Sequence, residues 1–273
     1  MSKTTTQPPV ATTAKPATTP PKKQSSEGNS EAKTVPPADI GAKLFKQAPA
    51  SPKDCLILIY DFESFTSFLS VPDIHRDVAR YLNHVDNHVR WLFHGGVPID
   101  MDKPVDALPL TILHEKFLGD GVMFIVEYQD QGTARSGTSR ALCKRMLYLK
   151  NQFHLVNKEA MKFMPVADLP QRIRFGLTYG TVLELSRPDG GTEYIGFPIN
   201  LAARLQKYAG KTSFLASARL PHSDEWMEKF DFVKVKAKAL RDRPDEFVYI
   251  DKNDLELAKK SGAAGDLFEL VKP

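Results

Sequence analysis

The feature that most constrains the fold is a continuous apolar run, CLILIY, at residues 55–60. Pro52 precedes this run and Asp61 follows it. Proline is tolerated at the start of a strand but not inside a central one, so these borders fit a strand that begins near Pro52. A short apolar run with such borders is typical of a strand that is buried on both faces. We therefore expect a sheet built around this segment.

Several further segments show helical or strand periodicity. Residues 73–94 repeat apolar side chains at helical spacing and end at a Gly-Gly pair. Two apolar segments flank Gly-Asp-Gly, which indicates a hairpin with Asp120 in its turn. We also expect helices at 62–70, 138–163 and 200–208, two strands at 172–179 and 181–185 that meet at Gly180, and short strands at 213–216, 230–236 and 246–251. This order predicts an α+β fold, a sandwich of helices packed on an antiparallel-rich sheet.

The first 52 residues differ in composition from the rest of the chain. They hold nine of the twenty prolines and are otherwise mostly Thr, Ser, Ala and Lys, which is typical of a disordered tail. Residues 1–54 contain eight lysines against four acids, whereas 55–273 balance 29 basic with 29 acidic residues. The positive charge is thus in the tail, which argues against a nucleic-acid-binding domain. We expect one folded domain at 53–252 and a C-terminal extension at 253–273.

The chain has two cysteines, Cys55 and Cys143, and neither has the spacing of a metal site or a disulfide framework. No stretch approaches the roughly 18 apolar residues of a membrane span. The first residues lack the apolar segment of a signal peptide. We therefore expect a cytoplasmic protein with no membrane partner.

Two pairs of residues are candidates for chemistry. Asp61 ends the first strand and Asp120 lies in the hairpin turn, so adjacent strands would bring both carboxylates to one end of the sheet. Paired carboxylates suit Mg²⁺ or Mn²⁺, although a strand-end cap and a turn residue are equally good interpretations of each aspartate alone. Asn200 and Arg204 are four residues apart and share a helix face, where they could hold a ribose and a phosphate or be ordinary surface residues.

These segments together resemble the catalytic domain of class III adenylate and guanylate cyclases. The family's three motifs appear in order as LILIYDFESFTSFL, KFLGDG and IGFPINLAARL, and RIRFGLTYGTV matches the strand before the third. The resemblance covers residues 55–251 and implies the class III cyclase-like sandwich. It also implies that each site binds two divalent ions, Mg²⁺ or Mn²⁺, through Asp61, Asp120 and the main-chain carbonyl of Phe62.

The resemblance assigns further roles by position. Asn200 would orient the ribose, and Arg204 would stabilise charge on the α-phosphorus in the transition state. A late-strand lysine, Lys236 or Lys238, would touch the triphosphate, and we take Lys238 as the candidate. Because the family builds its site between two domains, a chain with one such domain should be a homodimer with two composite sites.

The base would be recognised by Lys116 of KFLGDG and by Glu193, which replaces the Asp or Thr usual in adenylate cyclases. A Lys–Glu pair could hold adenine, uracil or cytosine, so hydrogen bonding leaves the base open. A pyrimidine would need a bulky wall, for which Tyr60 and Tyr194 are candidates, although both could equally be core aromatic residues.

A narrower resemblance favours a pyrimidine. YDFESF, YLNHVDNHVRWLF, KFLGDG, RIRFGLTYGTV and EYIGFPINLAARLQ are similar to the pyrimidine cyclases of bacterial Pycsar anti-phage systems. The similarity implies that the chain converts UTP to cyclic UMP, which activates a separate effector. The alternatives are a cytidylate cyclase acting on CTP, an adenylate cyclase, and an inactive nucleotide-binding domain of the same fold.

Overall fold

The computed structural model describes most of the chain beyond residue 43. The described residues are 44–128, 135–164, 168–222, 224–238, 240 and 246–271. Most of the tail that we predicted at 1–52 lies outside them. Within these ranges, no helix combines the length and the hydropathy needed to cross a membrane.

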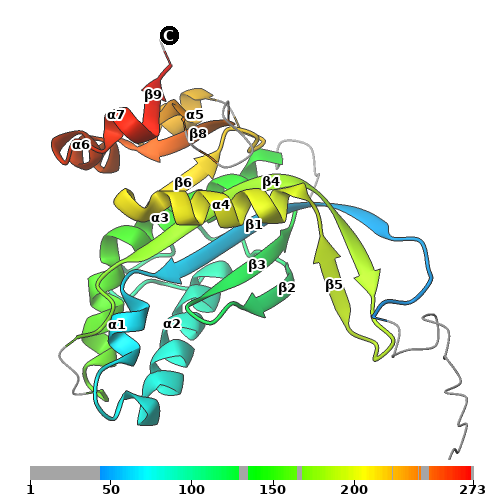
Figure 1. The fold of residues 1–273 in the computed structure, drawn as a ribbon, viewed down its shortest axis with the longest axis horizontal. Coiled ribbons are helices and arrows are strands. Elements are labelled where there is room, and N and C mark those ends of the chain that lie inside the picture. The colour runs from blue at the N-terminus through cyan, green and yellow to red at the C-terminus, as the bar shows by residue number, and fades with distance from the viewer. Residues whose placement is uncertain are drawn as a thin grey trace, which may run out of the picture. The chain divides into compact units, whose positions relative to one another are not determined.

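The described residues form a nine-stranded sheet with helices packed on it (Figure 1). The strands are β1 (Ser51–Phe62), β2 (Ile112–Phe117), β3 (Gly121–Glu127), β4 (Ile173–Ser186), β5 (Thr192–Ile195), β6 (Phe214–Ser217), β7 (Phe232–Ala237), β8 (Glu246–Asp251) and β9 (Phe268–Leu270). The helices are α1 (Phe65–Leu69), α2 (Val78–Phe93), α3 (Arg135–Ala160), α4 (Phe197–Tyr208), α5 (Asp224–Lys229), α6 (Lys252–Lys260) and α7 (Ala264–Leu267). This architecture confirms the predicted α+β fold class.

The sheet has the strand order β2-β3-β1-β4-β6-β8-β7-β9, and β5 pairs with β4. Only the pairing of β4 with β6 is parallel among these strands. The predicted hairpin forms from β2 and β3, and β1 lies between β3 and β4. The apolar run that opened the sequence is therefore a central strand.

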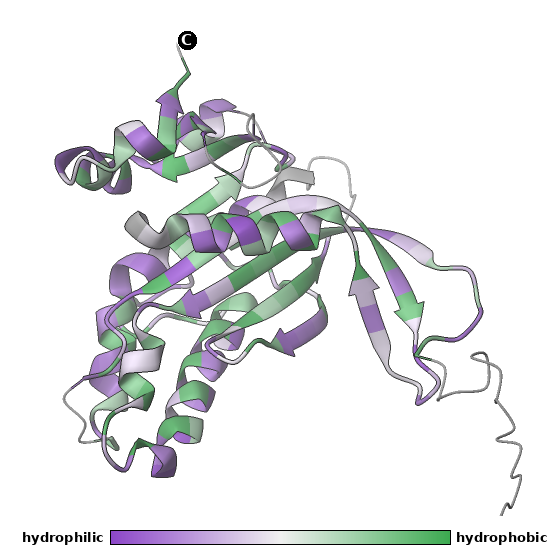
Figure 2. Cartoon of the chain, in the orientation of Figure 1, coloured by the Kyte–Doolittle hydropathy of each residue, from purple (hydrophilic) through white to green (hydrophobic). Residues whose placement is uncertain are grey.

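Alternation along β1 decides which side chains share a face of the sheet, because successive residues of a strand point to opposite sides. Leu56, Leu58, Tyr60 and Phe62 pack in the larger core with residues of α1, α2 and α3. Residues 55, 57 and 59 pack on the other face with Ala202 of α4. Figure 2 shows the hydrophobic character of the central strands between these layers. Asp61 continues the alternation on the α4 face.

One strand prediction was wrong. We expected two strands that meet at a turn at Gly180, but β4 runs without interruption through that position. A Cβ atom at Gly180 would lie 2.7 Å from Cγ of Pro198. Glycine is present here because the start of α4 approaches the strand closely, not because the chain turns.

Helix α4 lies very close to β4. A Cβ atom at Gly176 would lie 2.2 Å from the carbonyl oxygen of Ala202 and 2.5 Å from the amide nitrogen of Gln206. The hydroxyl of Thr178 donates to the carbonyl of Pro198 at 3.0 Å. Backbone contact of this kind fixes the height of α4 above the sheet, and with it the position of Asn200 and Arg204.

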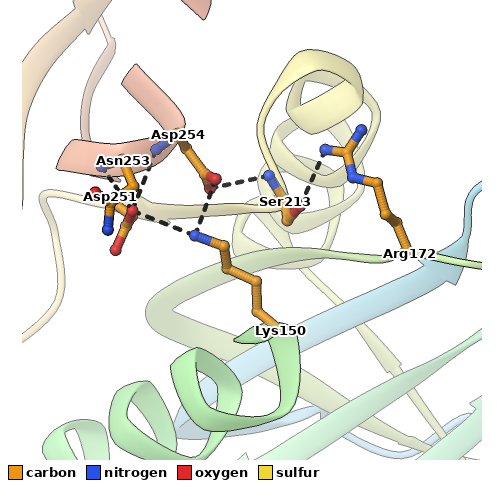
Figure 3. Close-up of polar contacts among 6 residues, drawn as sticks. All are labelled: Lys150, Arg172, Ser213, Asp251, Asn253 and Asp254. Carbon is orange, nitrogen blue, oxygen red and sulfur yellow. Dashed lines mark hydrogen bonds and ion pairs between the residues drawn. The ribbon is translucent and has the colours of Figure 1, made fainter. Parts of the chain in front are cut away.

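The residues beyond 252 are part of the sheet assembly, since β9 pairs with β7. A buried polar cluster anchors them (Figure 3). Lys150 of α3 reaches Asp254 at 2.9 Å and Asp251 at 3.3 Å. Asp251 caps α6 by accepting hydrogen bonds from the backbone of Asn253 and Asp254, and Asp254 accepts one from the amide of Ser213 at 3.0 Å. Every carboxylate of the cluster therefore has a donor.

Candidate active site

Asp61 is held by a residue that the sequence did not single out. It pairs across the sheet with Gly121 of β3 on one side and with Arg174 of β4 on the other. Arg174 donates two hydrogen bonds to its carboxylate, from Nε at 2.7 Å and from Nη2 at 2.5 Å. Asp61 is a buried residue, and its side chain is 11% exposed. No signal in the sequence pointed to Arg174, because a charged residue that alternates with apolar ones is typical of any strand position that faces solvent.

Opposing effects act on the pKa of the Asp61 carboxyl group. Burial raises the pKa of its carboxyl group, and the charge of Asp120 raises it further. Arg174 lowers the pKa through its hydrogen bonds and charge, and the nearby amide of Gln206 acts in the same direction. Overall the pKa of Asp61 is raised, so its neighbours do not fully offset the effect of burial on the charged carboxylate.

Asp120 lies where the sequence predicted, at the turn between β2 and β3. Its carbonyl oxygen accepts a hydrogen bond of 3.0 Å from the amide of Phe62. A Cβ atom at Gly121 would lie 1.8 Å from the carbonyl oxygen of Tyr60, so only glycine allows this approach. The hairpin thus brings Asp120 next to Asp61 at the end of β1. The side chain of Phe62 is buried in the core, which leaves only its main chain for the site.

Lys116 and Glu193 meet although they are far apart in the sequence. Nζ of Lys116, on β2, lies 3.1 Å from Oε2 of Glu193, on β5. The hydrogen bond from Lys116 lowers the pKa of the Glu193 carboxyl group below its usual value. Arg187 lies 3.5 Å from the other carboxylate oxygen. Lys116 pairs with Met123, whose side chain is in the cluster on the α4 face, so it shares a face with Asp61.

The structure corrects the prediction that Tyr60 could form a wall against the base. Tyr60 is 1% exposed and packs against Phe124 and Phe175 on the face opposite to Asp61. Alternation along β1 forces this placement, because Tyr60 directly precedes Asp61. Tyr194 is also largely buried, and its hydroxyl donates to Glu184 at 2.7 Å. Tyr60 is therefore not retained as a base-contacting residue, whereas the role of Tyr194 stays a prediction.

Asn200 and Arg204 lie on one face of α4, as the spacing predicted, but not on the face that meets Asp61. Asn200 is exposed and Arg204 is half-buried. Gln206, which lies beside Asp61, is buried. At about 100° per residue, Gln206 is turned by more than 100° from both Asn200 and Arg204. Within one chain, α4 therefore offers Gln206 to Asp61 and directs the other two side chains elsewhere.

The two late lysines take different positions. Lys236 lies within β7, opposite Phe247 of β8 and Glu269 of β9. Lys238 follows the strand, is exposed, and donates from Nζ to the carbonyl of Gly265 at 2.8 Å. Its side chain thus contacts the C-terminal segment.

The candidate donors for a divalent ion are the carboxylates of Asp61 and Asp120. The described residues contain no group of three or more His, Cys, Asp or Glu side chains that could hold a metal. Asp61 and Asp120 lie at the same end of β1, and the charge of Asp120 raises the pKa of Asp61, an effect that a divalent cation would relieve. Two carboxylates with open positions for phosphate oxygens fit Mg²⁺ or Mn²⁺, provided that Arg174 releases Asp61.

Comparison with known proteins identifies the architecture. The sequence matches no protein-family model and no curated protein. Among solved structures, the adenylyl cyclase CyaB from P. aeruginosa superposes with a TM-score of 0.54 at 16% identity, over 74% of this chain and 96% of that one. The guanylyl cyclase Cya2 superposes with a TM-score of 0.51 at 18% identity, over 75% of this chain and 93% of that one. The chain therefore has the fold of the class III nucleotide cyclase catalytic domains.

Proposed function

We propose that the protein is a nucleotide cyclase that works as a homodimer and converts UTP to 3′,5′-cyclic UMP and pyrophosphate. One observation carries the cyclase proposal: Asp61 and Asp120 lie side by side at the end of the central strand of a cyclase fold. Such a pair is a binding site for divalent ions and for a triphosphate bound through them.

The metal site would consist of Asp61, Asp120 and the main-chain carbonyl of Phe62, and it would hold two ions, Mg²⁺ or Mn²⁺. Bound ions would lower the pKa of the 3′-hydroxyl group and neutralise the triphosphate. Arg174 donates hydrogen bonds to both oxygens of the Asp61 carboxylate. It would therefore have to give way to the ions that bind there.

The remaining groups would come from the second chain. Arg204 would stabilise the charge that develops on the α-phosphate, Asn200 would orient the ribose, and Lys238 would contact the triphosphate. Asn200 and Arg204 face away from Asp61 of their own chain, so a second copy must bring them to it. This division makes each site depend on both chains.

An exposed apolar patch supports the dimer. Leu183 of β4 and Ile195 of β5 are opposite each other and are 39% and 48% exposed. Phe197, the first residue of α4, is 36% exposed. The β4–β5 hairpin leads directly into α4 (Figure 1), and Phe197 precedes Asn200 in the first turn of that helix. Apolar side chains exposed beside half of a composite site fit contact with a second copy of the chain.

Lys116 and Glu193 would recognise the base. The pair offers an ammonium donor and a carboxylate acceptor 3.1 Å apart, which fits O4 and N3–H of uracil. It fits cytosine and adenine as well, and the solved structures with this fold include adenylyl and guanylyl cyclases. The choice of UTP over CTP and ATP rests on the sequence resemblance to pyrimidine cyclases. The same resemblance supports a role in anti-phage defence through a separate effector that responds to the product.

Incubation of the purified protein with ATP, GTP, CTP and UTP in turn, with Mn²⁺ present, tests both levels of this proposal. We expect a product with the mass of cyclic UMP. If cyclic AMP or cyclic GMP is the only product, the proposed cyclase activity stands but the proposed pyrimidine specificity is refuted. If no nucleotide yields a product, the cyclase activity itself is refuted. Asp120→Ala should abolish turnover, whereas Asp102→Ala, a matched change of an exposed loop aspartate, should not.

A further inference from the structure

A third charged side chain adjoins the pair that we propose to recognise the base. Arg187 lies in the loop that joins β4 to β5, and its Nη1 lies 3.5 Å from Oε1 of Glu193. Lys116 approaches the other oxygen of the same carboxylate, with Nζ 3.1 Å from Oε2. Two cations therefore flank one carboxylate, which places a hydrogen-bond donor on each side of an acceptor.

All three of these side chains are accessible to a ligand. The side chains of Lys116, Arg187 and Glu193 are 50%, 41% and 25% exposed. The hydrogen bond from Lys116 and the nearby positive charges lower the pKa of the Glu193 carboxyl group, so Glu193 is a charged acceptor at neutral pH. A carboxylate, an ammonium and a guanidinium each form several hydrogen bonds. The contacts among the three therefore leave donors and acceptors for a base.

The loop between β4 and β5 holds Arg187 in place. Its amide donates to the carbonyl of Gly191 at 2.8 Å, and its carbonyl accepts from the amide of Gly190 at 3.2 Å. Asp189 accepts a hydrogen bond of 2.9 Å from Nη2 of Arg187 and another of 2.9 Å from the amide of Gly191. The loop thus orients the guanidinium group, and it is Nη1 that lies beside Glu193.

The bases differ in the order of donors and acceptors that they offer to such a site. Uracil presents an acceptor, a donor and an acceptor, namely O4, N3–H and O2, which complements a carboxylate with a donor on each side. Cytosine presents a donor and two acceptors, adenine a donor and an acceptor, and guanine an acceptor and two donors. Each of these three bases leaves one side chain of the set without a complementary group, which weakens binding.

We propose that Arg187 is a further specificity-determining residue, and that Lys116, Glu193 and Arg187 together select uracil over cytosine and the purines. The assignment rests on the proposed cyclase function and deepens it, because it derives the preference for UTP from hydrogen bonding. Lys116 and Glu193 alone fit uracil, cytosine and adenine equally. Loss of Arg187 should therefore remove the selectivity for uracil and leave the binding of other bases nearly unchanged.

Calorimetric titration of the full-length protein with 3′-deoxy-UTP and 3′-deoxy-CTP, in the presence of Mn²⁺, tests this proposal. Neither probe has the 3′-hydroxyl group, so neither can be cyclised, and the affinity is measured without turnover. We expect the wild type to bind the uracil probe about tenfold more tightly than the cytosine probe. Arg187→Ala should weaken the uracil probe at least fivefold and the cytosine probe less than twofold, because cytosine can pair with Lys116 and Glu193 alone.

Arg76→Ala is the matched control. Arg76 is also an exposed arginine beside an aspartate, 3.8 Å from Asp73, but it lies between α1 and α2, and its loss should change neither affinity. Two results would overturn the role of Arg187 and leave the cyclase proposal intact: equal affinity of the wild type for both probes, or an equal loss of both in Arg187→Ala. Binding of neither probe would refute the nucleotide site itself, and the role of Arg187 with it.

Discussion

Arg174 and Asp61 lie opposite each other on neighbouring strands, and two hydrogen bonds of 2.7 and 2.5 Å join the guanidinium to the carboxylate. These hydrogen bonds occupy both carboxylate oxygens of Asp61, the first proposed metal ligand. A divalent ion would therefore compete with Arg174 for Asp61, and a stability measurement with and without the ion can detect this competition.

Arg174→Ala should make folding depend on metal. Without Arg174, the buried carboxylate of Asp61 loses its partner, so the unfolding midpoint in chelator should fall by several degrees. Addition of Mn²⁺ should then raise the midpoint more in the variant than in the wild type, because the ion replaces the lost positive charge. The control is Arg172→Ala, which removes a salt bridge of 3.0 Å to Glu63 and should leave the Mn²⁺ response unchanged. An Mn²⁺ response of Arg174→Ala no larger than that of the wild type would contradict the competition.

Lys150→Met should be strongly destabilising. Lys150 is 9% exposed and holds two buried carboxylates, Asp251 and Asp254. Removal of the cation leaves both charges without the ammonium group of Lys150, which typically costs about 3–5 kcal/mol. Urea unfolding would measure the change in the free energy of unfolding. Lys158→Met removes an exposed lysine from the same helix and should change that free energy by less than about 0.5 kcal/mol. Equal effects would show that the cluster does not anchor the C-terminal segment.

Gly176→Ala should displace α4 from the sheet. The new methyl group would meet backbone atoms of Ala202 and Gln206 at 2.2 and 2.5 Å, and backbone cannot move aside cheaply. We expect a loss of about 3 kcal/mol in the free energy of unfolding. Gly137→Ala, inside α3, meets only a side-chain methyl group at 3.5 Å and should be neutral or stabilising by up to about 1 kcal/mol. A Gly176→Ala protein as stable as the wild type would disprove the close packing of α4.

Two partly buried histidines should make the protein sensitive to mild acid. Burial lowers the pKa of His88 and of His222 to about 4, and nearby positive groups add to the effect. The unfolded chain takes up these protons near pH 6.5 and the folded chain only near pH 4, so stability is full above pH 6.5 and falls as the pH drops through this window. At pH 5 the loss is on the order of 2 kcal/mol for each histidine.

Urea midpoints at pH 7.5 and 5.0 would measure this loss. Replacement of both histidines with glutamine should flatten the dependence, whereas His75→Gln, at an exposed residue, should not. An unchanged dependence in the double variant would place the acid sensitivity in other groups.

The sequence predicted those parts of the fold that depend on local chemistry. The Gly-Asp-Gly turn placed Asp120 beside Asp61, because a glycine at 121 is required wherever a hairpin passes so close to the neighbouring strand. The spacing of Asn200 and Arg204 likewise predicted that they share a helix face. Such features follow from a few consecutive residues.

The remaining features depend on contacts between distant segments. A wholly apolar run gives no sign of which residues face which core, so the direction of Tyr60 could not be read from it. Gly180 was misread as a turn because its cause, Pro198, belongs to another element. Arg174 became meaningful only when the sheet placed it opposite Asp61.

The central proposal is that two chains together complete each cyclase site, and mixing two inactive variants tests it most directly. Asp120→Ala and Arg204→Ala should each be inactive as pure proteins, whereas Lys207→Ala, an exposed change on the same helix as Arg204, should be active. After equal mixing and exchange of subunits, half of the dimers are mixed, and each mixed dimer has one intact site. We therefore expect cyclic nucleotide production at about one quarter of the wild-type rate. Production that stays at the level of the separate variants, although mixed dimers have formed, would contradict the composite site.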